Sequence, residues 1–221
     1  MIMSGAEDQY SLPFQPPESF VGILVSDVIA VKSRQSEADT QQSRRELIRT
    51  VFAAVEGLVW VYRGHIVTAA QHIDALNPEE EIVLSETSYQ ITEQGKVVAQ
   101  PRFTSLPAMI RLITRLANRV SPEFDVAFDT SDWEGFRRAI AIRNRVTHPK
   151  SESDLRIGDA DIAVSLDAFY WLFENTMHAM EAAVAVMKDH NEQFTEMLEK
   201  LKQGDPATVA AYRAAIRSDD N

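Results

Sequence analysis

The sequence IRNRVTHPK, from Ile142 to Lys150, closes a helix that is expected to begin near Ser131. Upstream of it, apolar residues recur at intervals that place them on one side of a helix. That side consists of Trp133, Phe136, Ile140 and Ile142. Pro149 ends the helix, because proline disfavours the helical backbone of the residue that precedes it. The pattern therefore predicts an amphipathic helix whose last turn is rich in cationic and polar side chains.

Three side chains at this helix end carry groups that can bind an anion or move a proton. Asn144 and His148 are four residues apart and therefore share a face of the helix. Arg143 lies about 140° round the helix from His148, at roughly 100° per residue, an angle that its long side chain can span. An imidazole with an ordinary pKa of about 6.5 moves protons near neutral pH, and a guanidinium donates two hydrogen bonds to a phosphate. We therefore take Arg143, His148 and Asn144 as the candidate site residues, and the family resemblance described below implies that they are catalytic, with the amide orienting either the imidazole or the phosphate.

This site lies in the basic part of an acidic chain. The 221 residues carry a formal net charge of −11, yet ten Lys and Arg outnumber seven Asp and Glu between residues 102 and 156. Such a distribution favours an anionic ligand at one site and disfavours a general nucleic-acid binder. The cations expected to hold a phosphate backbone are Arg145, Lys150, Arg138, Arg115 and Arg119. For the last two, which follow Arg111 at four-residue spacing, a solvated helix face is the alternative interpretation.

The rest of the chain predicts an all-α fold, an antiparallel bundle of four to five long helices. Apolar residues at helical spacing predict helices at 18–32, 44–76, 105–120 and 159–202, and a short final helix at 205–216. Residues 81–103 differ: they predict a small β-hairpin insertion, with short strands at 82–84, 89–92 and 96–98 and a turn at Gln94-Gly95. A helix as long as 159–202 needs a second surface to pack on, in the bundle or in a second copy. The expected organisation is a flexible tail at 1–17, a helical domain at 18–203, and a short helix with an acidic tail at 204–221.

Several classes of site are disfavoured by composition. The chain has no cysteine, which excludes disulfides and thiolate metal ligands. His65 and His72 lie seven residues apart without a recognisable third ligand, so we expect no metal and no cofactor. No secretory signal is visible, and the apolar stretches are too short to span a membrane. A cytoplasmic protein without a membrane partner is therefore expected.

The segment from Arg143 to Pro149 resembles the signature of HEPN (higher eukaryotes and prokaryotes nucleotide-binding) domains. In that signature an arginine and a polar residue precede a histidine by four to six intervening positions at the end of a core helix, and Asn144 fills the polar position here. The resemblance is specific over about twenty residues and architectural elsewhere, since the hairpin and the long last helix are not part of the minimal pattern. It implies a helical bundle that usually forms a homodimer and cleaves RNA without a metal ion, often as a toxin or antiviral effector. Single-stranded RNA would be the substrate, and an antitoxin or another regulatory protein would be a further partner.

One departure from the family pattern concerns regulation. Some toxin members carry a tyrosine two residues after the histidine, which their antitoxin modifies, whereas Lys150 occupies that position here. That regulatory route is therefore not expected, although cleavage itself is unaffected. Two alternatives stay open at this point. One is a catalytically silent HEPN-like module that binds a nucleotide or a protein, and the other is a purely structural role in which the cations complement the helix dipole.

Overall fold

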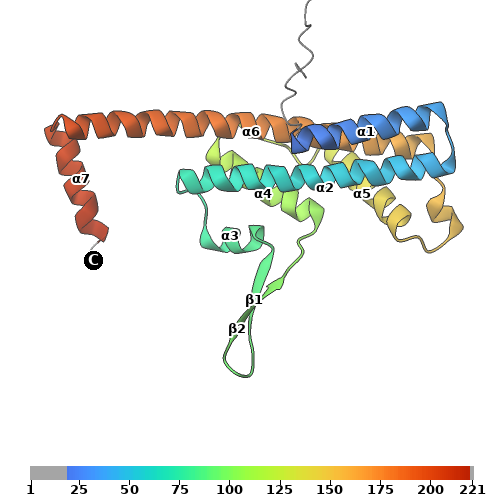
Figure 1. Cartoon of the computed structure of the whole chain (residues 1–221), viewed down its shortest axis with the longest axis horizontal. Coiled ribbons are helices and arrows are strands. Elements are labelled where there is room, and N and C mark those ends of the chain that lie inside the picture. The colour runs from blue at the N-terminus through green and yellow to red at the C-terminus, as the bar shows by residue number, and fades with distance from the viewer. Residues whose placement is uncertain (1–18, 220–221) are drawn as a thin grey trace, which may run out of the picture.

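The helix α2 (Gln41–His72) contributes more buried residues than any other helix in the computed structural model, which describes residues 19–219. Its fully buried side chains recur along the whole helix and include Leu47, Ile48, Val51, Phe52, Val55, Leu58, Tyr62 and Ile66. Around it pack α1 (Phe20–Glu37), α4 (Leu106–Val120), α5 (Ser131–Thr147) and α6 (Asp159–Lys202) (Figure 1). The predicted all-α bundle is thus confirmed in the described part of the chain, while the tail expected at 1–17 lies outside it.

The helices of the bundle do not all alternate in direction. The Gln41 side chain bonds the backbone of Ile157 just before α6 begins, and His72 at the other end of α2 bonds Asn191. The helices α2 and α6 therefore run side by side in the same direction. By contrast, α2 follows α1 after a short turn and runs antiparallel to it, and α5 runs antiparallel to α6 (Figure 1). Gly57 lets α1 come close, because a Cβ at this position would lie 2.7 Å from the side chain of Leu24.

The helix α5 has the bounds that the sequence predicts. Thr130 caps its first turn by accepting a hydrogen bond from the backbone of Trp133 at 3.3 Å. The expected apolar side is buried: Trp133 stacks on Phe136, with ring centroids 5.6 Å apart, and both rings contact Trp171 of α6. This packing presses one side of α5 against α6 and leaves its last turn at the surface.

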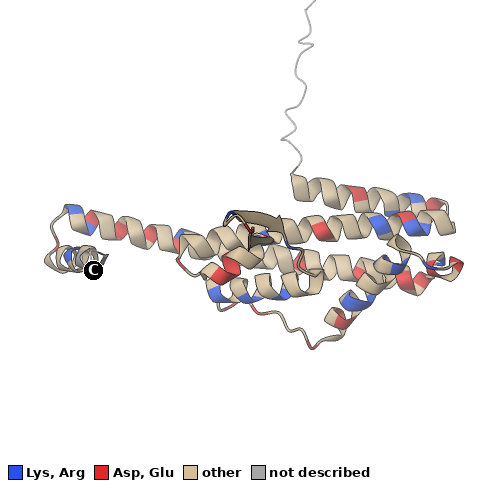
Figure 2. Cartoon of the chain, turned by 90° about the horizontal axis from the view of Figure 1, so that it is seen from below, with Lys and Arg blue, Asp and Glu red and all other residues tan. Residues whose placement is uncertain are grey.

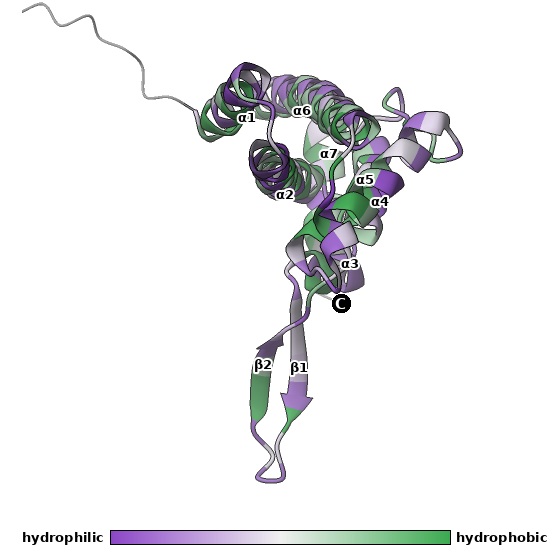
Figure 3. Cartoon of the chain, turned by 90° about the vertical axis from the view of Figure 1, so that its right-hand side faces the viewer, coloured by the Kyte–Doolittle hydropathy of each residue, from purple (hydrophilic) through white to green (hydrophobic). Residues whose placement is uncertain are grey.

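Residues 78–84 form a helix, α3 (Pro78–Leu84), and the prediction of a strand at 82–84 was wrong. Proline in the first turn, three glutamates there and Asn77 before them all favour a helix start. The hairpin itself is confirmed, with β1 (Thr87–Ile91) paired antiparallel to β2 (Val97–Pro101) and Gly95 at a φ of +75° in the turn. It projects away from the helices in two perpendicular views (Figures 1 and 3).

The last part of α6, beyond Asn191, extends past the end of α2 (Figure 1). Every residue from 188 to 200 is exposed, and α7 (Pro206–Asp219) turns back after Gly204 at a φ of +73°. We call residues 188–219 the α6–α7 arm. The surface of the arm includes large apolar side chains, among them Phe194, Met197, Tyr212 and Ile216. Among the helices of residues 19–219, none has an apolar stretch long enough to cross a membrane.

Candidate functional site

The last turn of α5 presents the three candidate catalytic residues at the surface. The backbone N–H of His148 donates to the carbonyl oxygen of Asn144 at 2.9 Å, which keeps the two residues one helical turn apart. His148 then leaves the helical conformation, at a φ of −126° and a ψ of 60°, just before Pro149. The predicted helix stop and the shared face of Asn144 and His148 are therefore both present.

Arg143 is held by two neighbours. One terminal nitrogen donates to the amide oxygen of Asn144 at 3.2 Å, and the other forms an ion pair with Glu56 of α2. The arginine side chain is 30% exposed and the glutamate 51%. Arg143, Asn144 and Glu56 also line a small pocket of about 190 Å³ between α2, α4 and α5. The structure thus joins the guanidinium to the amide and adds a carboxylate that the sequence did not suggest.

His148 is exposed, and its imidazole has no hydrogen-bond or ion-pair partner among residues 19–219. No contact within that range joins it to Arg143. The imidazole is therefore accessible to solvent.

Arg145 has a different environment from the one its sequence position suggested. It donates to the carbonyl oxygens of Asp154 and Arg156, at 3.0 and 2.8 Å, and pairs with the carboxylate of Asp161 at 2.6 Å. These bonds fix the loop after α5 to the start of α6. These contacts use three of the five N–H donors of the guanidinium, and a phosphate-binding role for Arg145 stays a prediction.

The arginines of α4 divide into three environments along the stripe, which lies on the outer side of the helix (Figure 2). Arg111 lies over the rings of Phe128 and Trp133, about 5 Å from each centroid. Arg119 binds both oxygens of Glu80, at 2.6 and 2.8 Å, and this contact lowers the pKa of the Glu80 carboxyl. Arg115 is exposed and has no side-chain partner in the described chain.

Arg115 and Arg119 of α4 also lie at a distance from the segment Arg143 to Pro149. Leu106 at the start of α4 lines the small pocket with Arg143. Arg115 and Arg119 follow nine and thirteen residues later, roughly 14 and 20 Å further along at 1.5 Å per residue. Lys150, two residues after His148, and Arg138, ten residues before it on α5, are exposed, and their side chains have no partner among residues 19–219. Lys150 is therefore a free cation close to His148 along the chain.

A larger cleft adjoins Arg143. Its volume is about 570 Å³, and α2, α4 and the base of the hairpin surround it. Sequence reasoning missed its residues Glu56, Trp60 and Arg63, although their spacing of four and three places them on one face of α2. That periodicity was the available signal. Glu86 and Phe103, which bracket the hairpin, gave no local signal because their position depends on how the insertion folds back.

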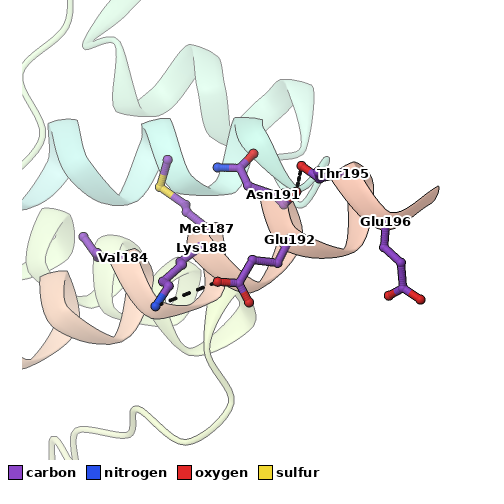
Figure 4. A pocket seen from close by; sticks show the side chains of 7 residues that line it. All are labelled: Val184, Met187, Lys188, Asn191, Glu192, Thr195 and Glu196. Atoms are coloured by element: carbon purple, nitrogen blue, oxygen red, sulfur yellow. Dashed lines mark hydrogen bonds and ion pairs between the residues drawn. The ribbon is translucent and has the colours of Figure 1, made fainter. Parts of the chain in front are cut away.

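Other hollows in the described chain contain none of the candidate catalytic residues. A shallow groove follows the outside of α6 at the root of the arm, where Lys188 pairs with Glu192 and the Thr195 hydroxyl bonds the Asn191 backbone (Figure 4). His72 contacts the ring of His190 and the amide of Asn191. No group of three or more potential metal ligands occurs within residues 19–219.

Comparisons with protein-family models, curated proteins and solved structures found no match for this chain.

Proposed function

We propose that this protein is a metal-independent endoribonuclease of the HEPN type, with Arg143, Asn144 and His148 at its centre. The observation that supports the proposal is the exposed last turn of α5. There the amide of Asn144 bonds Arg143 at 3.2 Å, and His148, one turn further, has no internal partner.

The proposed reaction uses the substrate's own 2′-hydroxyl. The neutral His148 imidazole takes the proton of that hydroxyl, and the 2′-oxygen forms a bond to the adjacent phosphorus. The bond from phosphorus to the 5′-oxygen breaks, and the leaving oxygen takes a proton from water. The products are a 2′,3′-cyclic phosphate and a 5′-hydroxyl end. Arg143 stabilises the charge that grows on the phosphate oxygens.

Glu56 is expected to regulate how available Arg143 is. The ion pair keeps the guanidinium at the end of α5, within reach of Asn144. It also opposes phosphate binding, because the carboxylate competes for the same donors. An exposed ion pair contributes little stability, about 0–1 kcal/mol, so a phosphate with two acceptor oxygens can replace it.

We further propose that two copies act together as a homodimer. At the α5 end, the side chains of Lys150 and His148 have no partner among residues 19–219, whereas Arg143 and Arg145 are paired, which leaves few free donors for a dianionic transition state. A second α5 end facing the first would double that number. This arrangement is expected to give one composite cleft rather than two separate sites.

The test is cleavage of a mixed RNA pool in EDTA by the wild type, His148→Ala and Arg143→Ala. The proposal expects cleavage by the wild type and a loss of at least about 100-fold in both variants. His65→Ala is the matched control, because His65 is an exposed histidine on α2 outside the site. A requirement for divalent metal, or full activity of His148→Ala, would overturn the proposal.

A catalytically silent binding module is the second candidate. The observation that favours it is the internal pairing of Arg143 with Glu56 and of Arg145 with Asp161. This function predicts that a nucleotide or protein ligand binds in a manner that depends on Arg143. It also predicts that RNA stays intact from mildly acidic to mildly basic pH.

A further inference from the structure

The cleft beside Arg143 combines exposed aromatic rings with paired charges. Trp60 on α2 is 62% exposed and Phe103 after β2 is 88% exposed, and both line the cleft. Leaving such rings in water forgoes a favourable burial. The ring of Trp60 is steadied by an edge contact with Phe20, with centroids 6.0 Å apart. The cleft therefore offers flat apolar surfaces that a ligand could cover.

The charged residues of the cleft are held in place. Arg63 donates to Glu86 at 2.8 Å, and the other oxygen of Glu86 accepts from the backbone N–H of Thr104 at 3.3 Å. Glu86 itself has a φ of +53°, a left-handed backbone that is unfavourable for glutamate. Strained positions of this kind persist where the surrounding structure fixes them and cluster at ligand sites. The left-handed backbone at Glu86 places its carboxylate at the wall of the cleft that also carries Arg63.

The walls of this cleft suit a nucleobase better than they suit an apolar protein helix. An apolar helix of a second copy would desolvate both the Arg63–Glu86 pair and the Arg143–Glu56 pair, which is costly. A nucleobase has an apolar face for stacking and a polar edge for hydrogen bonds, so it satisfies both kinds of wall. The volume of about 570 Å³ lies within the range of small-molecule sites.

We infer that this cleft is a nucleobase subsite for single-stranded RNA. A base adjoining the scissile phosphate stacks on Trp60 or Phe103, while that phosphate reaches Arg143 at the cleft wall. The inference rests on the proposed function, because Arg143 is the residue that links the cleft to the phosphodiester. Stacking in this cleft adds to the affinity for RNA a contribution that depends on the presence of a base but little on which base it is, whereas the other contacts are electrostatic.

The experiment measures binding of two single-stranded 12-mers to the full-length chain. One is 2′-O-methyl oligouridine, which lacks the attacking hydroxyl and cannot be cleaved by the proposed route. The other is the same 2′-O-methyl backbone without bases. The wild type is expected to bind the base-bearing strand about 10- to 100-fold more tightly than the abasic strand. Tryptophan fluorescence should respond only to the base-bearing strand, and Trp60→Phe should abolish that response although Trp133 and Trp171 remain.

Trp60→Ala and Phe103→Ala are expected to weaken binding of oligouridine towards the abasic level and to leave abasic binding unchanged. Trp60→Phe should recover most of the loss, and Phe194→Ala, an exposed ring on the α6–α7 arm, should have no effect. Three results would overturn the inference. The first is wild-type affinity for oligouridine in Trp60→Ala and Phe103→Ala, and the second is an equal loss of affinity for the abasic strand in these variants. The third is that the wild type binds neither strand.

The cleavage assay separates this inference from the proposed function. If binding depends on bases and on Trp60 but the wild type leaves RNA intact, the nuclease proposal is contradicted and the subsite is supported. If cleavage needs His148 but both aromatic variants keep the wild-type kcat/KM, the nuclease proposal is supported and the subsite is contradicted.

Discussion

Arg143 on α5 forms an ion pair with Glu56 on α2, and the same guanidinium donates to Asn144. The two helices are joined at the residue that the sequence marks as the phosphate-binding cation. The pair therefore couples the candidate site to the helix that contributes the most buried residues to the bundle. Under the proposed function, a phosphate would have to share the guanidinium with the Glu56 carboxylate or replace it.

Replacing Glu56 with Gln should make Arg143 more available to phosphate. We expect RNA to bind about 3- to 10-fold more tightly at low salt, with a difference that shrinks as screening increases. Stability should fall by less than about 1 kcal/mol, because the pair is substantially exposed. Glu46→Gln is the control, since Glu46 pairs with Arg34 at 3.7 Å away from the site. Weaker RNA binding by Glu56→Gln would show that the carboxylate positions Arg143 instead of competing with phosphate.

Replacing Arg145 with Ala should destabilise the fold more than replacing any nearby free cation. The variant loses two hydrogen bonds to backbone carbonyls and the ion pair with Asp161. We expect a decrease of about 1–3 kcal/mol in the free energy of unfolding, measured with urea. Arg138→Ala, at an exposed position on the same helix, should change it by no more than about 0.5 kcal/mol. Equal effects of the two substitutions would contradict a structural role for Arg145.

The Glu80–Arg119 contact should make stability depend on pH in the acidic range. Hydrogen bonds from Arg119 lower the pKa of Glu80 in the folded chain. Because the folded pKa is below the ordinary value of about 4.3, the contribution is complete above that value and is lost as pH falls through the lowered pKa. The stability difference between wild type and Glu80→Gln should therefore shrink below about pH 4. Glu123→Gln, at an exposed residue without an ion pair in the described chain, should show no such trend. A constant difference down to pH 3 would be inconsistent with this linkage.

The α6–α7 arm should exchange backbone hydrogens faster than the helices of the bundle. Residues 188–200 are exposed all round, whereas the core-facing side of α2 is buried from Leu47 to Tyr62. Local opening needs little energy where few apolar contacts are broken. Hydrogen–deuterium exchange should thus show low protection at 188–202 and high protection at 47–62. Comparable protection in both segments would mean that another surface, such as a second copy, covers the arm.

Local patterns predicted the helices but not the contacts between their polar residues. The bounds of α6 (Asp159–Lys202) follow from a long apolar periodicity and a terminating Gly204. The stretch 82–84 was misassigned because three apolar residues, two of them β-branched, outweighed the helix-start signal at Asn77-Pro78. In such a short segment, capping and charge decided the structure.

The candidate site shows the same division between local and long-range information. The exposure of His148 follows from Pro149 and the end of an amphipathic helix. The pairing of Arg143 with Glu56 spans 87 residues, and that of Arg119 with Glu80 spans 39. Such pairs depend on how helices pack, so periodicity and motif spacing do not specify them.

The measurement that tests the central claim most directly uses a DNA oligonucleotide containing a single ribonucleotide, incubated with the protein in EDTA. Attack by the substrate's own 2′-hydroxyl predicts one cut, on the 3′ side of the ribonucleotide, with a 2′,3′-cyclic phosphate end. His148→Ala should slow that cut by at least about 100-fold. An uncut strand, cuts at deoxynucleotides, or an equal rate in His148→Ala would contradict the account.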